Sequence, residues 1–262
     1  MKKLAWRRII MSAVALGLLI YVAVSLYYTS QKNEEVTCNK IEVIITDKDK
    51  LGFVTEGDVL SILKSSGIAI IGQPVQSVKL AEIEKLLDTK SYIKDAEVYT
   101  TIDGVLNVKL KQRTPVVRVH TPSGAFYMDN EGFVFPLSKT YSYYVPVVTG
   151  SFVLPFKLPY KGELPDKSTA QTLRRLLGFV EYLNNDSFWN AQIEQINILP
   201  NADTELITRV GNHVVRLGQL VEFEKKLKRL FTFYQKVSPV EGWDKYPVID
   251  LRFNNQVVGI LK

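Results

Sequence analysis

The chain has 262 residues, of which 46 % are hydrophobic, and a formal net charge of +6. Residues 1–8 carry four bases and no acid, and the remaining 29 bases and 27 acids nearly cancel. A surface so close to neutral excludes the broad basic footprint that binds nucleic acid. Cys38 is the only cysteine, which excludes an internal disulfide, so the folded part must be stabilised by its hydrophobic core.

The N-terminal region has the pattern of a membrane anchor. Residues 9–28 contain no charged side chain, and at about 1.5 Å per residue they span roughly 30 Å, the thickness of a bilayer's hydrocarbon core. Bases precede this segment and acids follow it, which predicts a cytoplasmic tail over residues 1–8 and folded domains outside the cytoplasm. A cleaved signal peptide would have a shorter apolar core that ends in small residues. We therefore expect an uncleaved transmembrane helix, followed by a polar tether over residues 29–37.

Residues 38–113 have the periodicity of a small α+β domain with the order βααββ. The alternation in residues 40–46 predicts a strand, and Thr55 with Asp58 predicts a capping box at the start of the first helix. Ser77 is expected to cap the second helix. Two further strands, over residues 92–101 and 105–111, are expected to meet at the tight-turn pair Asp103-Gly104.

The remainder, residues 114–262, predicts a second domain with a mainly antiparallel sheet and two helices. Amphipathic helices are expected after Ser168, ending near residue 184, and over residues 220–237. Asn254-Asn255 is expected to form a tight turn, because asparagine tolerates positive φ. The expected strands are residues 116–120, the hairpin 126–135, and residues 145–149, 193–199, 205–210, 213–217, 248–253 and 256–261.

No residue pattern indicates an enzyme, a metal site or a cofactor site. His120 and His213 stand far apart in expected strands without neighbouring ligands at metal spacing, and we interpret both as strand-surface residues. The chain has no G-x-S-x-G motif, Walker loop or G-x-G-x-x-G motif. Residues 129–132 faintly resemble a calcium loop, but the missing further ligands favour a hairpin turn. Three tyrosines form either an exposed recognition patch or the border of the β core: Tyr141, Tyr143 and Tyr144.

The last expected strand points to a function. A terminal strand often lies at the edge of a sheet, where backbone N–H and C=O groups remain free to pair. Its apolar side chains favour association with another apolar surface: Val257, Val258, Ile260 and Leu261. Either the protein's own loops cover this edge, or it accepts a partner strand by β-augmentation.

Four segments, in this order along the chain, resemble the FtsQ/DivIB family of bacterial cell-division proteins: residues 93–116, 127–135, 145–150 and 249–253. The first resembles the exit of the family's POTRA domain, with its E-R-x-P-V motif, in which Gln112 replaces the usual Glu. The second resembles its Asp-x-Glu-Gly hairpin, and the third its L-P-x-L-x-G turn. The last resembles its D-L-R-Y strand, with Phe253 in place of Tyr.

The resemblance implies a POTRA domain over residues 38–113, a C-terminal β domain over residues 114–262, and a non-enzymatic scaffold that helps control septal peptidoglycan synthesis. It also implies a single-pass protein of the cytoplasmic membrane, located at the division septum with its bulk in the periplasm. Family members bind FtsB and FtsL, two small single-pass proteins, through the last strand, and other division proteins through the POTRA domain. Carried over to this chain, the partner-binding residues are Arg229, Arg252, Phe253, Gln256, Val257, Val258, Gly259, Ile260 and Leu261.

Two other functional classes remain as alternatives. POTRA modules also occur in outer-membrane assembly and secretion factors, but such a factor would need a barrel of many ten-residue alternating strands. A membrane-anchored cell-wall hydrolase would need a nucleophile or metal site, which the sequence does not present. We therefore expect a protein without cofactor, nucleic acid or small-molecule substrate.

Overall fold

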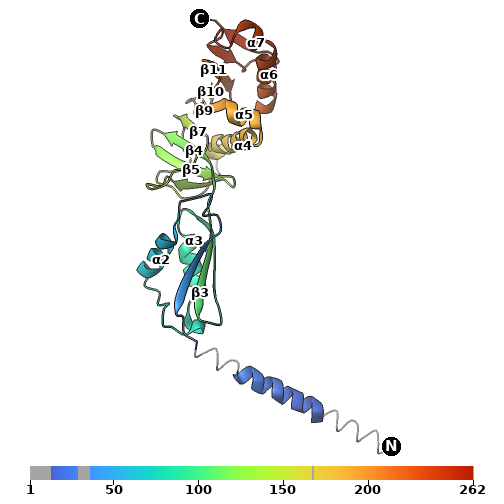
Figure 1. Ribbon diagram of the computed structural model, residues 1–262. Helices are drawn as coiled ribbons and strands as arrows, with labels where there is room; N and C mark the ends of the chain where they lie inside the picture. Colours follow the sequence, from blue (N-terminus) through green and yellow to red (C-terminus); the bar gives the residue numbers. More distant parts are fainter. Residues whose placement is uncertain (1–12, 29–35, 167, 262) are drawn as a thin grey trace, which may run out of the picture. The chain divides into compact units, whose positions relative to one another are not determined.

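The computed structural model describes residues 13–28, 36–166 and 168–261 (Figure 1). The chain divides into two compact units, Met1–Gln112 and Arg113–Lys262. Residues 13–28 are helical and exposed. Among the described residues, no helix combines the length and the apolar character that a membrane crossing requires. The expected cytoplasmic tail, the first four residues of the expected span and most of the expected tether lie outside the described ranges.

The first unit is built on a three-stranded sheet with the order β1-β3-β2. Strand β1 (Lys40–Ile45) runs parallel to β3 (Val105–Gln112), and β2 (Ile93–Thr100) runs antiparallel to it. The β2–β3 hairpin turns at Gly104, whose φ of 85° lies in the left-handed region that glycine adopts without strain. The predicted strands and their Asp-Gly turn are confirmed.

Two helices, α2 (Glu56–Ser65) and α3 (Leu80–Asp88), contact this sheet and each other (Figure 1). The predicted capping box starts α2. The Thr55 hydroxyl accepts a hydrogen bond from the Asp58 amide at 3.2 Å, and the Asp58 carboxylate accepts one from the Thr55 amide at 2.9 Å. Two of the amide groups at the start of the helix are thereby satisfied.

The second helix begins later than the sequence predicts. Ser77 ends a short 3-10 turn, Val75–Ser77, and its hydroxyl donates to the carbonyl of Pro74 at 2.8 Å. Lys79 occupies the N-cap position of α3 without a side-chain hydrogen bond. The prediction that Ser77 caps this helix is therefore wrong, because a local turn already uses its hydroxyl.

The second unit is organised by a ten-stranded sheet with the order β13-β12-β11-β10-β9-β7-β4-β5-β6-β8. Neighbouring strands are antiparallel except in the pairs β4–β7, β7–β9 and β11–β12, which confirms the predicted α+β class with a mainly antiparallel sheet. The strands are β4 (Pro115–Thr121), β5 (Gly124–Asp129), β6 (Phe133–Pro136), β7 (Val147–Gly150), β8 (Gly162–Glu163), β9 (Ile193–Ile198), β10 (Thr204–Thr208), β11 (Val214–Gly218), β12 (Val248–Asp250) and β13 (Val258–Ile260).

Three helices, α4 (Gln171–Asn185), α5 (Ser187–Gln192) and α6 (Phe223–Lys236), pack together over this sheet (Figure 1). Phe179 of α4 meets Phe223 of α6 edge to face, and Phe188 of α5 meets Phe231 of α6 in the same way. One hydrophobic core joins these helices to the strands. A short helix, α7 (Ser238–Glu241), follows α6.

The helix starts in this unit also depart from the sequence prediction. Ser168 lies in a 3-10 turn, and α4 begins only after it, with Ala170 at the N-cap position, so the predicted cap at Ser168 is wrong. Helix α5 was not predicted at all. Asp186, expected only to end α4, starts α5 as well, because its carboxylate accepts from the amides of Phe188 and Trp189 at 2.9 and 3.1 Å.

A buried ion pair fixes the β5–β6 hairpin. Arg113 Nη1 donates to Asp129 Oδ2 at 2.9 Å, and the two side chains are 12 % and 3 % exposed. The other carboxylate oxygen of Asp129 accepts from the amides of Glu131 and Phe133 at 3.0 and 2.8 Å. The guanidinium also lies 3.4 Å above the centre of the Phe133 ring. Residues 129–132 therefore form a structural turn.

Candidate partner-binding edge

Strand β13 forms one edge of the ten-stranded sheet. It pairs with β12 in an antiparallel register that places Val258 opposite Asp250 and Ile260 opposite Val248. An edge strand leaves alternate backbone N–H and C=O groups without a partner in its own sheet. The turn before it contains Asn255 at a φ of 56°, as the sequence predicts. The last strand is thus short and lies at an edge.

The two faces of β13 have different surroundings. Val257 packs against the hydrophobic core, and Gly259 lies so close to Tyr246 that a Cβ would approach the ring's Cδ1 to 2.5 Å. Because side chains alternate along a strand, Val258 and Ile260 point to the opposite face. Ile260 is 38 % exposed there. The strand therefore offers apolar side chains next to its free backbone edge.

Arg252 is held beside this edge by two acids. Its Nη2 and Nε donate to the carboxylate of Asp250 at 2.6 and 3.0 Å, and its Nη1 lies 3.7 Å from Asp203 Oδ2. Burial acts to raise the pKa of Asp250, but the hydrogen bonds and charge of Arg252 outweigh burial and hold that pKa below its usual range. Asp250 is therefore an ionised anchor that orients Arg252.

Arg229 joins α6 to the chain that leads into the edge strand. Its Nη2 donates to the carbonyl of Leu251 at 3.1 Å and to that of Phe253 at 3.4 Å. Phe253 itself is 49 % exposed. Arg229, Arg252 and Phe253 thus lie at the connection between β12 and β13.

Two residues that contribute to this edge were not found from the sequence. Tyr246 supports Gly259 from the loop before β12, and Asp250 orients Arg252. No local pattern marks Tyr246, because its contact depends on where the loop crosses the last strand. Asp250 lies within residues 249–253, and its position two residues before Arg252 is a sequence signal for this contact.

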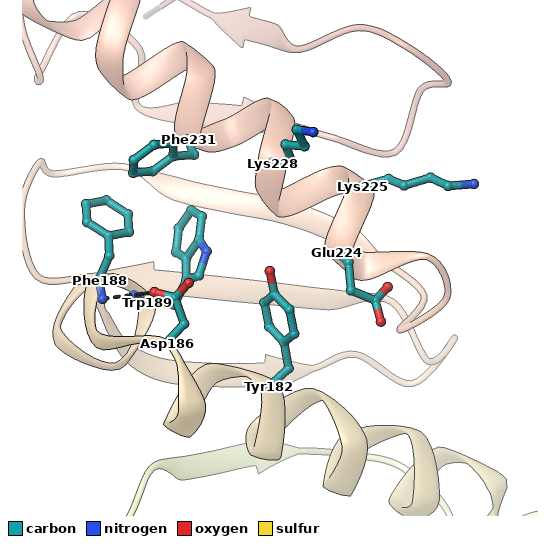
Figure 2. A pocket seen from close by; sticks show the side chains of 8 residues that line it. All are labelled: Tyr182, Asp186, Phe188, Trp189, Glu224, Lys225, Lys228 and Phe231. Carbon is teal, nitrogen blue, oxygen red and sulfur yellow. Dashed lines mark hydrogen bonds between the residues drawn. The ribbon is translucent and has the colours of Figure 1, made fainter.

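A separate groove lies between α4, α5 and α6 (Figure 2). It encloses about 420 Å³ and has aromatic walls and a charged rim. Two of the rim charges already have partners within the chain, since Asp186 caps α5 and Lys225 pairs with Glu222. The lining residues are Tyr182, Asp186, Phe188, Trp189, Glu224, Lys225, Lys228 and Phe231.

The histidines differ in their surroundings. His213 is only 4 % exposed, and its Nε2 lies 2.8 Å from the Tyr234 hydroxyl and 3.4 Å from that of Thr208. The interpretation of His213 as a strand-surface residue is therefore wrong. Burial lowers the pKa of His213, and it also lowers that of the partly buried His120 in β4. In the part of the chain that the structure describes, no cluster of three or more His, Cys, Asp or Glu residues is placed to hold a metal ion.

The three tyrosines before β7 were expected to form either an exposed recognition patch or the border of the β core, and the structure shows some of each. Tyr144 is 88 % exposed, whereas Tyr141 and Tyr143 are partly buried. The amide of Tyr143 donates to the Tyr127 hydroxyl at 3.3 Å, which joins this segment to the buried β5 strand. Tyr144 is therefore the exposed member of the three.

Comparison with known proteins identifies both units. Residues 114–260 match the family described as FtsQ/DivIB, C-terminal related, and residues 36–111 match a POTRA-like domain. The chain is 29 % identical over 175 residues to "Cell division protein FtsQ" of Salinibacter ruber, a match that covers 64 % of each protein. It is 28 % identical over 173 residues to the protein of that name in Rhodothermus marinus, which covers 64 % of this chain and 60 % of the relative. The chain thus spans less than two thirds of the length of these relatives. Because the first match extends over more than half of the chain, the protein belongs to the FtsQ/DivIB, C-terminal related family.

Proposed function

We propose that this protein is a non-enzymatic scaffold of the cell-division machinery that binds FtsB-like and FtsL-like single-pass proteins through the free edge of β13. The observation that carries the proposal is the position of β13 at the end of the sheet, with Ile260 exposed beside it. A partner strand added there would satisfy the free backbone groups and bury the apolar side chains. The membership of the family and the names of the two relatives support a role in division.

The proposed partner-binding site is the corner of the sheet that contains the last strand and its supports. Arg229, Arg252 and Phe253 form the approach to the strand, and residues 256–261 form the strand and its flanks. Arg229 donates to backbone carbonyls and brings a positive charge to this corner, whereas the charge of Arg252 is balanced by Asp250 and Asp203, so an acidic side chain of the partner would be attracted mainly to Arg229. Because hydrogen bonds within the protein already fix both guanidinium groups, they would act as preorganised contacts for a partner.

In this proposal the chain is anchored in the cytoplasmic membrane by residues 9–28, with residues 1–8 in the cytoplasm and residues 29–37 as a tether. The POTRA domain, residues 38–113, and the C-terminal β domain, residues 114–262, would then lie in the periplasm at the septum. The uncharged run and the bases before it support this orientation. The POTRA domain would bind other division proteins, and the whole scaffold would help control septal peptidoglycan synthesis.

The test is co-purification of the full chain from membranes, with a charge introduced at the edge. Val258→Glu should reduce the retention of FtsB-like and FtsL-like proteins at least about tenfold, because a carboxylate would be desolvated in the new strand pair. Val240→Glu is the matched control, since Val240 is 81 % exposed on α7. Circular dichroism must show that both variants are folded. Equal retention by folded Val258→Glu and by the control would contradict the edge-strand proposal.

A further inference from the structure

Backbone hydrogen bonds to two loops hold residues 36–39, where the chain enters the POTRA-like unit. The carbonyl of Val36 accepts from the Val75 amide at 2.9 Å, and the Cys38 amide donates to the carbonyl of Gln73 at 2.8 Å. On the other side, the Asn39 amide donates to the carbonyl of Gly104 at 2.9 Å. Residues 36–39 are therefore fixed between the loop before α3 and the β2–β3 turn.

The end of the unit that contains residues 36–39 exposes aliphatic side chains to solvent. Ile102, at the tip of the β2–β3 hairpin, is 90 % exposed, and Ile71 in the neighbouring loop is 57 % exposed. Val36 and Val75 lie beside Ile102 and help to line a shallow depression of about 200 Å³. Single exposed aliphatic residues are common on protein surfaces. What distinguishes Ile102 and Ile71 is their place at the end of the domain where the chain enters.

The length of the connecting chain indicates what covers this surface. Only residues 29–35 separate the described helix, which ends at residue 28, from Val36. Fully extended, eight peptide steps reach at most about 28 Å. If residues 9–28 cross the membrane, as the proposed function states, the end that carries Val36 must stay near the bilayer surface.

We propose that this end of the POTRA-like unit docks on the outer surface of the bilayer, with Ile102 and Ile71 inserted at the level of the lipid headgroups. The inference rests on the proposed membrane anchor. It adds a second attachment, which would fix the orientation of the domain relative to the membrane. Burying an isoleucine side chain is favourable, and the tether makes docking an intramolecular event with a high effective concentration.

The chemistry of the surface indicates apolar rather than electrostatic docking. Residues 71–76 and 100–104 contain no lysine or arginine, and Asp103 follows Ile102. A hydrogen bond from the Thr101 side chain and one from the backbone lower the pKa of Asp103, so its carboxylate is charged at neutral pH. A zwitterionic bilayer should therefore suffice, and anionic lipid should not strengthen the contact.

The test uses the full chain in phosphatidylcholine nanodiscs with a nitroxide on the lipid headgroup as quencher. A bimane label is placed on Gln76→Cys, which is exposed beside Ile102, whereas the native Cys38 is 0 % exposed and protected from labelling. The same label on Asp49→Cys, an exposed residue that follows β1 at the opposite end of the three-stranded sheet, is the control. The Gln76 label should be quenched and the Asp49 label should not. Replacing Ile102 and Ile71 by Asn should lower the docked-to-free ratio about fivefold or more, as expected for lost apolar burial.

Each outcome distinguishes the docking from the anchor. A chain that stays with the nanodisc while the Gln76 label is quenched no more than the Asp49 label contradicts the docking and leaves the anchor intact. Equal quenching with and without the two isoleucines shows that the tether alone brings the domain close, which also contradicts the docking. A chain that elutes apart from the nanodisc contradicts the proposed anchor and the docking together.

Discussion

Arg229 Nη2 donates a hydrogen bond to the carbonyl oxygen of Leu251 at 3.1 Å, and so ties helix α6 to the residue that follows β12. The same nitrogen lies 3.4 Å from the carbonyl of Phe253. The residue expected from the family resemblance to contact a partner is thus also part of the support of the edge strand. A substitution here acts on the fold and on binding together, and the two effects must be measured separately.

Replacing Arg229 by methionine should lower the free energy of unfolding by about 1–3 kcal/mol, because two carbonyl groups lose a charged donor. Urea unfolding followed by circular dichroism measures this change. Lys228→Met is the matched control, since Lys228 lies next to Arg229 with an exposed side chain. If the two variants are equally stable, the hydrogen bonds to Leu251 and Phe253 do not support the connection.

Gly259→Ala should displace β13, because the added methyl group would lie 2.5 Å from Tyr246 Cδ1. We expect a loss of about 1–3 kcal/mol in stability and weaker partner binding. The double variant with Tyr246→Ala should recover part of the loss, with a coupling free energy of about 0.5–3 kcal/mol. Additive effects in that double-mutant cycle would show that the close approach does not constrain the strand.

Gln112→Glu, which restores the residue usual in the family, should destabilise this particular POTRA-like unit by about 1–3 kcal/mol at pH 7. The Gln112 side chain is fully buried, and its Nε2 donates to the carbonyl of Leu51 at 3.0 Å and to Asp47 Oδ1 at 3.2 Å. A carboxylate would lose both donations and face the acid of Asp47. Differential scanning calorimetry at pH 7 and pH 4.5 checks this, since protonation should relieve part of the loss. A variant as stable as the wild type would refute the argument.

The C-terminal unit should lose stability as the pH falls below about 6.5, the ordinary pKa of an unfolded histidine. Burial lowers the pKa of His213 in the folded state, although the nearby Trp243 backbone and Asp244 act to raise it. The unfolded chain therefore takes up the proton at a higher pH than the folded chain, and protonation favours unfolding. Unfolding free energies measured between pH 8 and pH 5 should show this slope.

His213→Gln should flatten the pH dependence, because the titrating group is gone. His120→Gln should flatten it less, since the pKa of His120 is also lowered but its side chain is only partly buried. A His213→Gln variant with the full slope of the wild type would assign the pH dependence to other groups.

The order of elements was largely predictable from the sequence, because alternation and helical spacing report which side chains face the core. The exact starts of helices were less predictable. Thr55 and Asp58 form the predicted capping box, whereas Ser77 and Ser168 lie in 3-10 turns that no local pattern distinguishes from a cap. Helix α5 was missed because six residues are too few to show a helical period.

The edge position of the last strand was predictable from the sequence, and the contacts that support this strand were less so. The terminal position of the last strand indicated an edge, and the structure places β13 there. The roles of Arg229 and Tyr246 as supports could be recognised only from the tertiary structure. Arg229 contacts Leu251 and Tyr246 contacts Gly259, and both pairs are far apart in the sequence. The burial of His213 was hidden for the same reason, since its partner Tyr234 lies on another element.

Site-specific photo-crosslinking in dividing cells tests the edge-strand site most directly, because the label leaves the strand in place. A photoreactive amino acid at Ile260, which is 38 % exposed on β13, should form covalent adducts that mass spectrometry identifies as FtsB-like or FtsL-like proteins. The same label at Val240, which is 81 % exposed on α7, should not. Adducts with these proteins from Val240 but none from Ile260 would contradict the binding site that we propose.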